Sequence, residues 1–339
     1  MQSTHADLPV AVMSGLAEGG DRLVARRALA LGLPLLAPLP LSLDDYRTDC
    51  RTLESAGELD ALLGQAQVIH LPLAEGNDAD AVRVPGAARD RQYAQLGVFI
   101  SSHCQVLLAL WDGKASDGAG GTSDVVHYHL HGDMPGLGRI DAPPNLLADD
   151  DSDLAFHIVC SRERAEAAMP QALRTHWLTR STRSNGEGPM PDGYARLFHQ
   201  LGEFTADAAT YADAIERDSA SLLPPPELLP ARGSLPRIDA LYRRADWLAL
   251  HFRQRVHQSM ALLHVLAVLT GLLLMTYAEF VAHPLLMGTI LALFATGAAV
   301  AWLGKRRSWH RRYLDYRVLA EGLRVQAYWA IASVPSSYR

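Results

Sequence analysis

The apolar positions of the first 160 residues form short runs, separated by polar or glycine-rich turns and by stretches of helical composition. The runs short enough to be strands are residues 9–13, 33–39, 68–73, 105–110 and 154–160. The stretches of helical composition are residues 22–31, 92–102 and 125–130. Because run 105–110 is continuously apolar, it is typical of a strand buried on both faces of a parallel sheet. The alternation predicts an α/β domain with a Rossmann-like parallel sheet.

Two of the predicted strand-to-helix turns are rich in glycine. The first is Ser14-Gly-Leu-Ala-Glu-Gly-Gly-Asp21, and the second is Gly118-Ala-Gly-Gly-Thr-Ser-Asp124. A glycine turn before a helix directs backbone N–H groups and the positive end of the helix dipole at a phosphate. Turns that follow parallel strands of one sheet meet at its carboxyl edge, where open α/β sheets bind their ligands. The two turns together therefore predict an anion site.

The pattern changes completely in the last hundred residues. Between residues 256 and 304 Glu279 is the only formally charged residue, and it separates two apolar stretches of 20 residues each, 259–278 and 284–303. Twenty helical residues span ~30 Å, the thickness of the hydrocarbon core of a bilayer. We therefore expect two membrane spans that form a hairpin. A core hairpin of a water-soluble protein is the alternative.

Basic residues flank the hairpin on one side only. Arg253 and Arg255 precede the first span, and the residues that follow the second are Lys305, Arg306, Arg307, Arg311 and Arg312. The short loop between the spans contains neither Lys nor Arg. Positive charge resists translocation, so both ends of the chain are expected in the cytoplasm. His264, within the first span, is either a neutral hydrogen-bonded histidine or part of a pore.

The segments on either side of the hairpin carry apolar stripes at helical spacing. The first stripe is Ile238, Leu241, Ala245, Leu248, Phe252 and Val256, and the second is Trp302, Trp309, Tyr313, Tyr316, Ala320 and Leu323. Steps of three and four residues predict a coiled-coil-like seam. The membrane helices are thus expected to continue as a cytoplasmic helical stalk, which pairs within the chain or with neighbouring chains. Trp302 and Trp309 fit an interfacial aromatic belt equally well.

Composition supports a division near Arg237. The chain has 31 basic and 37 acidic residues, but the part from Arg237 onward has 13 basic and 5 acidic residues, so the acidic excess lies in front of it. An acidic front part argues against nucleic acid as its partner. The three cysteines, Cys50, Cys104 and Cys160, are far apart, which argues against a disulfide framework or a zinc site. Histidines 127, 129 and 131 alternate along a predicted helix, so no metal site is expected.

The two turns carry a resemblance to a known family. Ser14-Gly-Leu-Ala-Glu-Gly-Gly-Asp21 resembles the Ser-Gly-x-Ala-x-Gly-x-Asp turn of the DprA branch of the SLOG superfamily, and Gly120-Gly121-Thr122 resembles its second turn. Leu108-Ala-Leu-Trp-Asp-Gly-Lys114 looks like the bacterial SLOG sensor branch. The hairpin, with Trp309-His-Arg-Arg-Tyr-Leu-Asp-Tyr-Arg317 after it, is similar to the SLATT two-transmembrane effector domains. The expected domains are a SLOG-like domain (1–165), a helical and linker region (166–236) and a two-transmembrane effector domain (237–339).

The resemblance implies a receptor for a nucleotide-derived signal of the NAD or ADP-ribose type, without a further cofactor. It also implies a homo-oligomeric membrane effector of bacterial antiphage defence, placed in the inner membrane. The implied ligand-binding residues are Ser14, Gly15, Glu18, Gly19, Asp21, Asp112, Gly120, Gly121 and Thr122. Asp21 either accepts hydrogen bonds from ribose hydroxyls or caps its helix.

Four further residues complete the expected site. Arg22 and Lys114 are the nearest cations for a pyrophosphate, with a solvated surface role as the alternative. Tyr46 and Arg47, which we expect in a loop after a strand, are candidates to stack on a base.

An enzyme is the competing hypothesis. A membrane-anchored nucleotide N-glycosidase or phosphoribohydrolase would use Glu18, Asp112 or Asp124 as its acid. Phosphoribohydrolases of the LOG branch carry Gly-Thr-x-x-Glu, whereas here the last position is Val125 and Asp124 comes one residue early. One residue on a helix turns a side chain by ~100°, which favours binding over hydrolysis. A membrane scaffold with a vestigial nucleotide fold is the third hypothesis.

Overall fold

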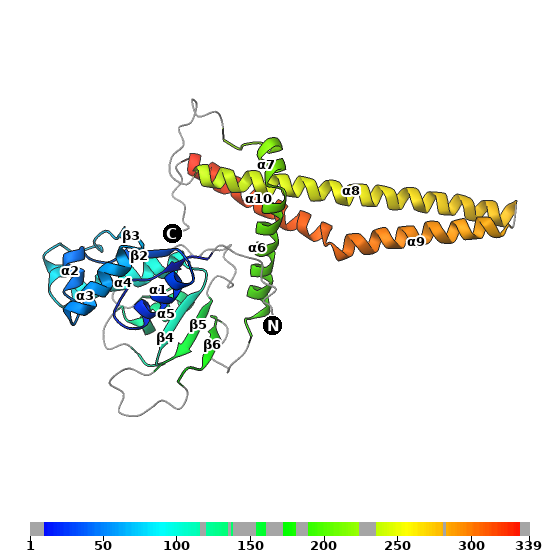
Figure 1. The fold of residues 1–339 in the computed structure, drawn as a ribbon. Coiled ribbons are helices and arrows are strands. Elements are labelled where there is room, and N and C mark those ends of the chain that lie inside the picture. The colour runs from blue at the N-terminus through cyan, green and yellow to red at the C-terminus, as the bar shows by residue number, and fades with distance from the viewer. Residues whose placement is uncertain are drawn as a thin grey trace. The chain divides into compact units, whose positions relative to one another are not determined.

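A computed structural model describes residues 10–115, 120–134, 137, 154–160, 172–180, 189–223, 235–280 and 283–332. The chain divides into two compact units, and the boundary lies between Leu197 and Phe198 (Figure 1). The first unit is built from strands and helices, and the regular elements of the second, where it is described, are all helices. This confirms an α/β part followed by a helical part.

The first unit alternates strands and helices as predicted. Its elements are β1 (Val12–Met13), α1 (Gly20–Ala30), β2 (Leu35–Leu39), α2 (Leu43–Arg47), α3 (Leu53–Leu63), β3 (Gln67–His70), the 3-10 helix η1 (Ala81–Arg83), α4 (Ala87–His103), β4 (Leu107–Trp111), α5 (Thr122–His131), β5 (Ala155–Val159) and β6 (Thr175–Leu178). Each expected strand has a counterpart that differs by a few residues at its ends. The apolar runs therefore located the strands correctly.

The strands form two three-stranded sheets instead of one continuous sheet. In the first sheet β1, β2 and β3 are all parallel, in that order. In the second, β5 lies between β4, which is parallel to it, and β6, which is antiparallel. In the register of this pair Val12 lies beside Leu35 and Met13 beside Leu36 of β2, and the Val12 N–H donates to the Pro34 carbonyl over 2.9 Å. Strand β6 lies in the region that we expected to hold only helices and linkers.

Each sheet has an apolar core of its own. The core beside the first sheet consists of Leu16, Ala25, Leu35, Ala37, Leu39, Leu41, Tyr46, Leu59, Leu62 and Val82. The core beside the second consists of Leu107, Ala109, Val126, Leu130, Ala155 and Leu178. Helices α1, α2 and α3 thus bury their apolar sides on the first sheet, and α5 packs on the second.

Helices α2 and α3 were not expected. The polar stretch after β2 was interpreted as a loop, but residues 43–47 are helical. Side-chain caps explain the difference: the Asp45 N–H donates to Ser42 Oγ over 3.2 Å, and the Ser55 N–H donates to Thr52 Oγ1 over 3.1 Å. Such caps satisfy free N–H groups of the first helical turn. Tyr46 and Arg47 therefore lie in α2, and their placement in a loop was wrong.

The second unit contains most of α6 (Asp192–Thr210) together with α7 (Ala212–Asp218), α8 (Leu235–Glu279), α9 (Pro284–Arg306) and α10 (Trp309–Ile331). Helix α9 runs back along the second half of α8, and α10 packs along its first half (Figure 1). Ser308 has a left-handed backbone, with φ of 50°, and ends the helical path between α9 and α10. The expected spans lie wholly within α8 and α9.

Helices α8 and α9 expose their apolar segments. Both are long and apolar enough to cross a membrane, and only 6% of the residues in each apolar window are buried. Met275 is 62% exposed and Phe294 is 72% exposed. A hairpin that formed the core of a water-soluble protein would bury these side chains, so that alternative does not fit. His264 Nδ1 lies 2.6 Å from the Met260 carbonyl oxygen of its own helix.

The stalk predicted from the apolar stripes is a pairing of α8 with α10 within the chain. Ala245, Leu248 and Phe252 of α8 are buried, as are Tyr316 and Ala320 of α10. The buried stripe of α8 differs from the predicted one at its start: Leu241 is 42% exposed, and its neighbour Tyr242 is buried instead.

Candidate functional site

The first glycine turn connects β1 to α1 and is held in shape by its own groups. The Leu16 N–H donates to Ser14 Oγ over 3.1 Å, and Leu16 is fully buried in the left-handed region with φ of 59°. Gly19 precedes α1 with φ of 99°, a conformation that favours glycine. No side chain caps α1 at this residue, so its first N–H groups are not used by a capping side chain.

Asp21 closes the first turn. Its carboxylate accepts hydrogen bonds from the Ala17 N–H and the Ser14 hydroxyl. The residue is exposed by surface area, yet protein atoms crowd its carboxyl group, and this burial raises the pKa of Asp21 despite the two hydrogen bonds. The structure thus gives Asp21 a role in holding the turn.

The second glycine turn leads into α5. Gly120 has φ of 86°, and its N–H donates to Asp124 Oδ2 over 3.0 Å. Gly121 is the N-cap residue of α5, where no side chain makes a capping hydrogen bond. Thr122 is the first helical residue and is exposed. Asp124 therefore closes this turn from the first turn of its helix, as Asp21 does in the other turn.

Both glycine turns pack against neighbouring residues of helix α4. A Cβ added to Gly15 would lie 2.8 Å from Leu96 Cδ2, and one added to Gly120 would lie 2.7 Å from the Ala94 nitrogen. Such short distances show that only glycine fits without a shift of its neighbours. Gly20, at the start of α1, approaches Leu110 of β4 in the same way, with an added Cβ at 3.3 Å. The structure therefore brings the two turns to one part of the first unit.

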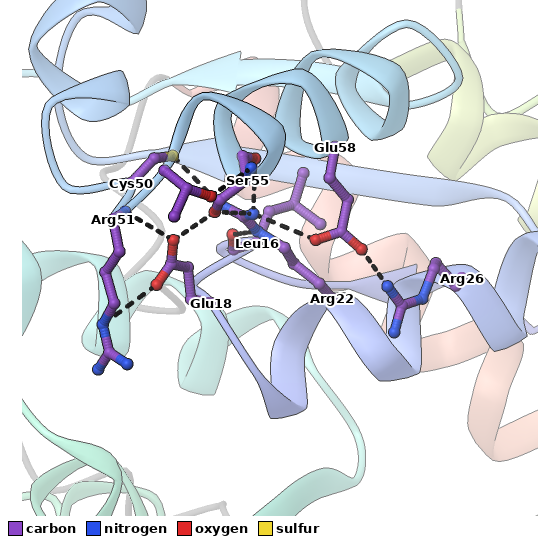
Figure 2. A network of polar contacts seen from close by, with 9 residues as sticks. Leu16, Glu18, Arg22, Arg26, Cys50, Arg51, Ser55 and Glu58 are labelled. Carbon is purple, nitrogen blue, oxygen red and sulfur yellow. Dashed lines mark hydrogen bonds and ion pairs between the residues drawn. The ribbon is translucent and has the colours of Figure 1, made fainter. Parts of the chain in front are cut away.

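Arg22 is not a solvated cation. It is 3% exposed, and its guanidinium lies in the network drawn in Figure 2. Nε donates to the Leu16 carbonyl over 3.0 Å, and Nη1 donates to the Ser55 carbonyl and hydroxyl over 2.8 and 2.7 Å. The remaining partners are Glu58 Oε2 at 3.3 Å and Cys50 Sγ at 3.3 Å. Arg22 thus fixes the first turn to α3 from within the protein.

Glu18 ties the same turn to the loop before α3. Its carboxylate accepts hydrogen bonds from the Ser55 hydroxyl and, over 2.9 Å, from the Arg51 N–H (Figure 2). Arg51 Nε lies 3.4 Å from Glu18 Oε2 in an ion pair. These hydrogen bonds, that from Ser55 first, lower the pKa of Glu18. A carboxylate held ionised is suited to fixing the turn and poorly suited to donating a proton at neutral pH.

The aromatic residue proposed to stack on a base points inward. Tyr46 is 4% exposed, and its hydroxyl donates to the Gly15 carbonyl over 2.5 Å. Burial raises the pKa of Tyr46 well above its usual range. Arg47, on the surface of α2, donates to Asp60 Oδ1 over 2.9 and 3.1 Å and to Asp44 over 3.1 Å. Tyr46 therefore stabilises the first turn from the protein interior.

Asp112 and Lys114 follow β4. Asp112 is 9% exposed, and its Oδ1 accepts the Lys114 N–H over 3.1 Å. The Lys114 side chain is exposed, and its carbonyl accepts a hydrogen bond from the Trp111 indole over 2.6 Å. Burial raises the pKa of the Cys160 thiol, and the charge of Asp112 raises it further. Of the predicted polar residues, Lys114 and Thr122 are exposed groups that an anion could reach, whereas the surface residue Arg47 is paired with Asp44 and Asp60.

Sequence reasoning did not identify the residues that support the turns. Arg51, Ser55 and Glu58 around α3 hold the first turn, and Tyr93 of α4 donates its hydroxyl to Asp49 in the loop before α3. The N-cap Thr52 was the available signal, since it marks the start of a helix whose first turn contains Ser55. Recognising α3 would have indicated that this loop lies beside the first turn.

No group of three or more His, Cys, Asp or Glu side chains suited to a metal ion lies within the described residues. His129 is buried in α5, with Nδ1 2.9 Å from Ser101 Oγ and Nε2 3.1 Å from the Leu154 carbonyl. The rings of His127 and His131 lie with their centroids 4.8 Å apart. Comparison of the chain with protein-family models, curated proteins and solved structures gives no match.

Proposed function

We propose that the protein is a membrane-bound receptor whose α/β unit, with a Rossmann-like SLOG arrangement, binds a nucleotide-derived anion of the NAD or ADP-ribose type. The two glycine turns hold the phosphates, and the SLATT-like helical unit carries the response to the membrane. In this proposal the response is disruption or permeabilisation of a bacterial inner membrane as a defence against phage.

The observation that carries the proposal is the approach of both glycine turns to Leu96 and Ala94 of α4. Helices α1 and α5 begin at these turns, and neither N-cap residue, Gly19 or Gly121, has a side chain that satisfies the free N–H groups. Two helix N-termini in one part of a unit supply backbone donors and two positive dipole ends. A pyrophosphate matches this pair because it offers two adjacent anionic groups.

The contacts of the acids favour binding over hydrolysis. Each carboxylate that an N-glycosidase would use accepts a backbone N–H: Glu18 from Arg51, Asp112 from Lys114 and Asp124 from Gly120. A general acid must carry a proton near neutral pH, and the lowered pKa of Glu18 works against that. The contacts of these three carboxylates are thus explained by a structural role, because each one holds a turn or loop in place.

The membrane part follows from α8 and α9. Their exposed apolar segments fit a hydrocarbon core, and the basic residues at one end of the hairpin favour the cytoplasmic side for both termini. A single hairpin cannot enclose a water-filled path, because a pore lined by helices needs several of them. The proposal therefore requires several copies of the chain, arranged around an axis normal to the membrane.

Calorimetric titration of the purified full-length protein in detergent tests the receptor. We expect saturable binding of ADP-ribose or NAD, and none of adenosine, which has the same base and ribose but no phosphate. Competition by inorganic pyrophosphate would place the recognition on the phosphates. Absence of heat with both nucleotides, for protein that melts cooperatively, would refute the receptor proposal.

A further inference from the structure

Two groups of basic residues in α8, α9 and α10 differ in their partners. Those of the first group lie on α10 and have acidic partners. Arg311 Nη2 is 2.6 Å from Glu203, Arg312 Nη1 is 3.0 Å from Asp207, and Arg317 Nη1 is 3.2 Å from Asp246. Arg324 Nη1 is 2.9 Å from Glu321. These cations are neutralised within the protein.

The second group lies where the apolar segments end, and we call it the basic belt. It consists of Arg253, Arg255, Lys305, Arg306 and Arg307, all of them exposed. No salt bridge joins these five residues to an acid anywhere in the described parts of the chain. The guanidinium carbon of Arg306 lies 5.1 Å from the ring centroid of Trp302, which is 59% exposed.

The two halves of the basic belt lie at the same level of the helical unit. Trp309, two residues beyond Arg307, packs against the core cluster that contains Phe252, the neighbour of Arg253. The guanidinium carbon of Arg312 also lies 5.6 Å from the Phe252 ring. The end of α9 and the middle of α8 therefore carry their cations at the same level along the helical unit.

The position along the helices matches a headgroup layer. Arg255 precedes the apolar segment 259–278 by four residues, which is ~6 Å along a helix, and Lys305 follows segment 284–303 by two residues, or ~3 Å. The polar layer on each side of a hydrocarbon core is ~5–8 Å thick. Cations at this depth, next to an exposed tryptophan, meet lipid phosphates.

We propose that the basic belt binds the headgroups of anionic phospholipids. This inference rests on the membrane insertion in the proposed function and is independent of the nucleotide. Arginine pairs with phosphate through two parallel N–H donors, and the five cations lack the internal acids that occupy the first group. An acidic protein segment would need to follow the belt around both helices, whereas lipid phosphates already lie in that plane.

The test uses full-length protein reconstituted in phosphatidylcholine vesicles. Brominated phosphatidylglycerol or brominated phosphatidylcholine is added as a quencher of tryptophan fluorescence, because Trp302 and Trp309 flank the belt. The ratio of the two quenching curves gives the relative association constant of the lipids. We expect phosphatidylglycerol to bind about fivefold more strongly, the equivalent of ~1 kcal/mol for one cation at an anionic surface. The preference should fall at high salt.

Two double variants test the belt, R253Q/R255Q and R306Q/R307Q. Each leaves the cations of the other helix in place, so the excess of positive charge that orients the hairpin in the membrane is retained. Each should lower the preference for phosphatidylglycerol, and a combined variant that also carries K305Q, and so lacks all five cations of the belt, should bring the ratio close to one. The matched control is R237Q/R244Q, which removes two exposed arginines from the far end of α8. The control should keep the wild-type ratio.

A wild-type ratio of one, or an equal loss in the control, would overturn the inference. A preference that survives in the combined variant would overturn it too. Extraction of the vesicles with alkaline carbonate separates this failure from that of the proposed function. Protein that stays in the membrane without a lipid preference refutes the basic belt alone, whereas protein released by carbonate refutes membrane insertion, on which both proposals depend.

Discussion

Replacement of Gly121 by aspartate changes the charge at the start of α5 with little change to the fold. Gly121 is the N-cap residue of α5 and has φ of −75° and ψ of 173°, an extended conformation that any residue adopts. Aspartate and asparagine are both favoured at N-caps and exceed glycine there by a few tenths of a kcal/mol. Gly121→Asp and Gly121→Asn should therefore melt at or slightly above the wild-type temperature.

The two variants should differ strongly in their affinity for ADP-ribose. A phosphate held by the first N–H groups of α5 would lie ~6 Å from a carboxylate at residue 121, and at an effective dielectric constant of about 40 the repulsion is ~1.4 kcal/mol for each negative charge. That corresponds to about a tenfold weaker association for one charge and more for a pyrophosphate. Asparagine has nearly the same size and capping ability as aspartate but no charge, so Gly121→Asn should weaken the binding of the nucleotide much less.

The assay is calorimetric titration of ADP-ribose into wild-type and variant full-length proteins at two salt concentrations. We expect the aspartate variant to bind ADP-ribose at least tenfold more weakly than the asparagine variant does, with a difference that narrows as salt is added. Equal affinity of the two variants would refute the placement of a phosphate at the start of α5. A vestigial fold predicts that outcome.

The remaining predictions concern stability, followed by urea or thermal unfolding of the full-length protein. Gly120→Ala should destabilise it by ~2 kcal/mol or more, because the added Cβ meets backbone at 2.7 Å and φ is positive; Gly19→Ala, at an open position, should cost ~1 kcal/mol. An equal loss of stability in the Gly120→Ala and Gly19→Ala variants would contradict the packing of Gly120 on α4. Arg22→Lys should cost ~3 kcal/mol, since an ammonium cannot reach all the buried acceptors, whereas Arg26→Lys on the same helix should cost under ~0.5 kcal/mol. Asp21 has a raised pKa in the folded protein, so the native state binds the proton more strongly and stability falls as pH rises from its ordinary value of 3.8. Asp21→Asn should therefore gain stability relative to the wild type as pH rises from about 4 to 7; a difference in melting temperature that does not change with pH would show that the carboxyl group is not desolvated.

The long-range pattern of the chain was the most predictable part. Two uncharged segments of membrane length and apolar stripes at helical spacing depend only on the order of residues along one helix, and α8, α9 and α10 follow them. The alternation of strands and helices in the first unit was predictable for the same reason. The division into two sheets was not, because it depends on which strand edges pair, and apolar runs do not encode that choice.

The direction of polar side chains was the least predictable part of the candidate site. Tyr46 was expected to face a ligand, but α2 turns it inward to the Gly15 carbonyl. Arg22 was considered as a cation for a pyrophosphate, but it is buried beneath the first turn by its contacts with α3. Both outcomes depend on short helices set by the N-caps Ser42 and Thr52, a local signal that apolar periodicity does not register.

Hydrogen–deuterium exchange of the full-length protein, with and without saturating ADP-ribose, tests whether the two glycine turns share one phosphate site. If one anion is held by both glycine turns, the amides of residues 15–22 and 121–124 should both exchange more slowly in the presence of the nucleotide, because the ligand occupies N–H groups at the starts of α1 and α5. Slowing in neither segment, or in only one of them, would contradict a shared phosphate site.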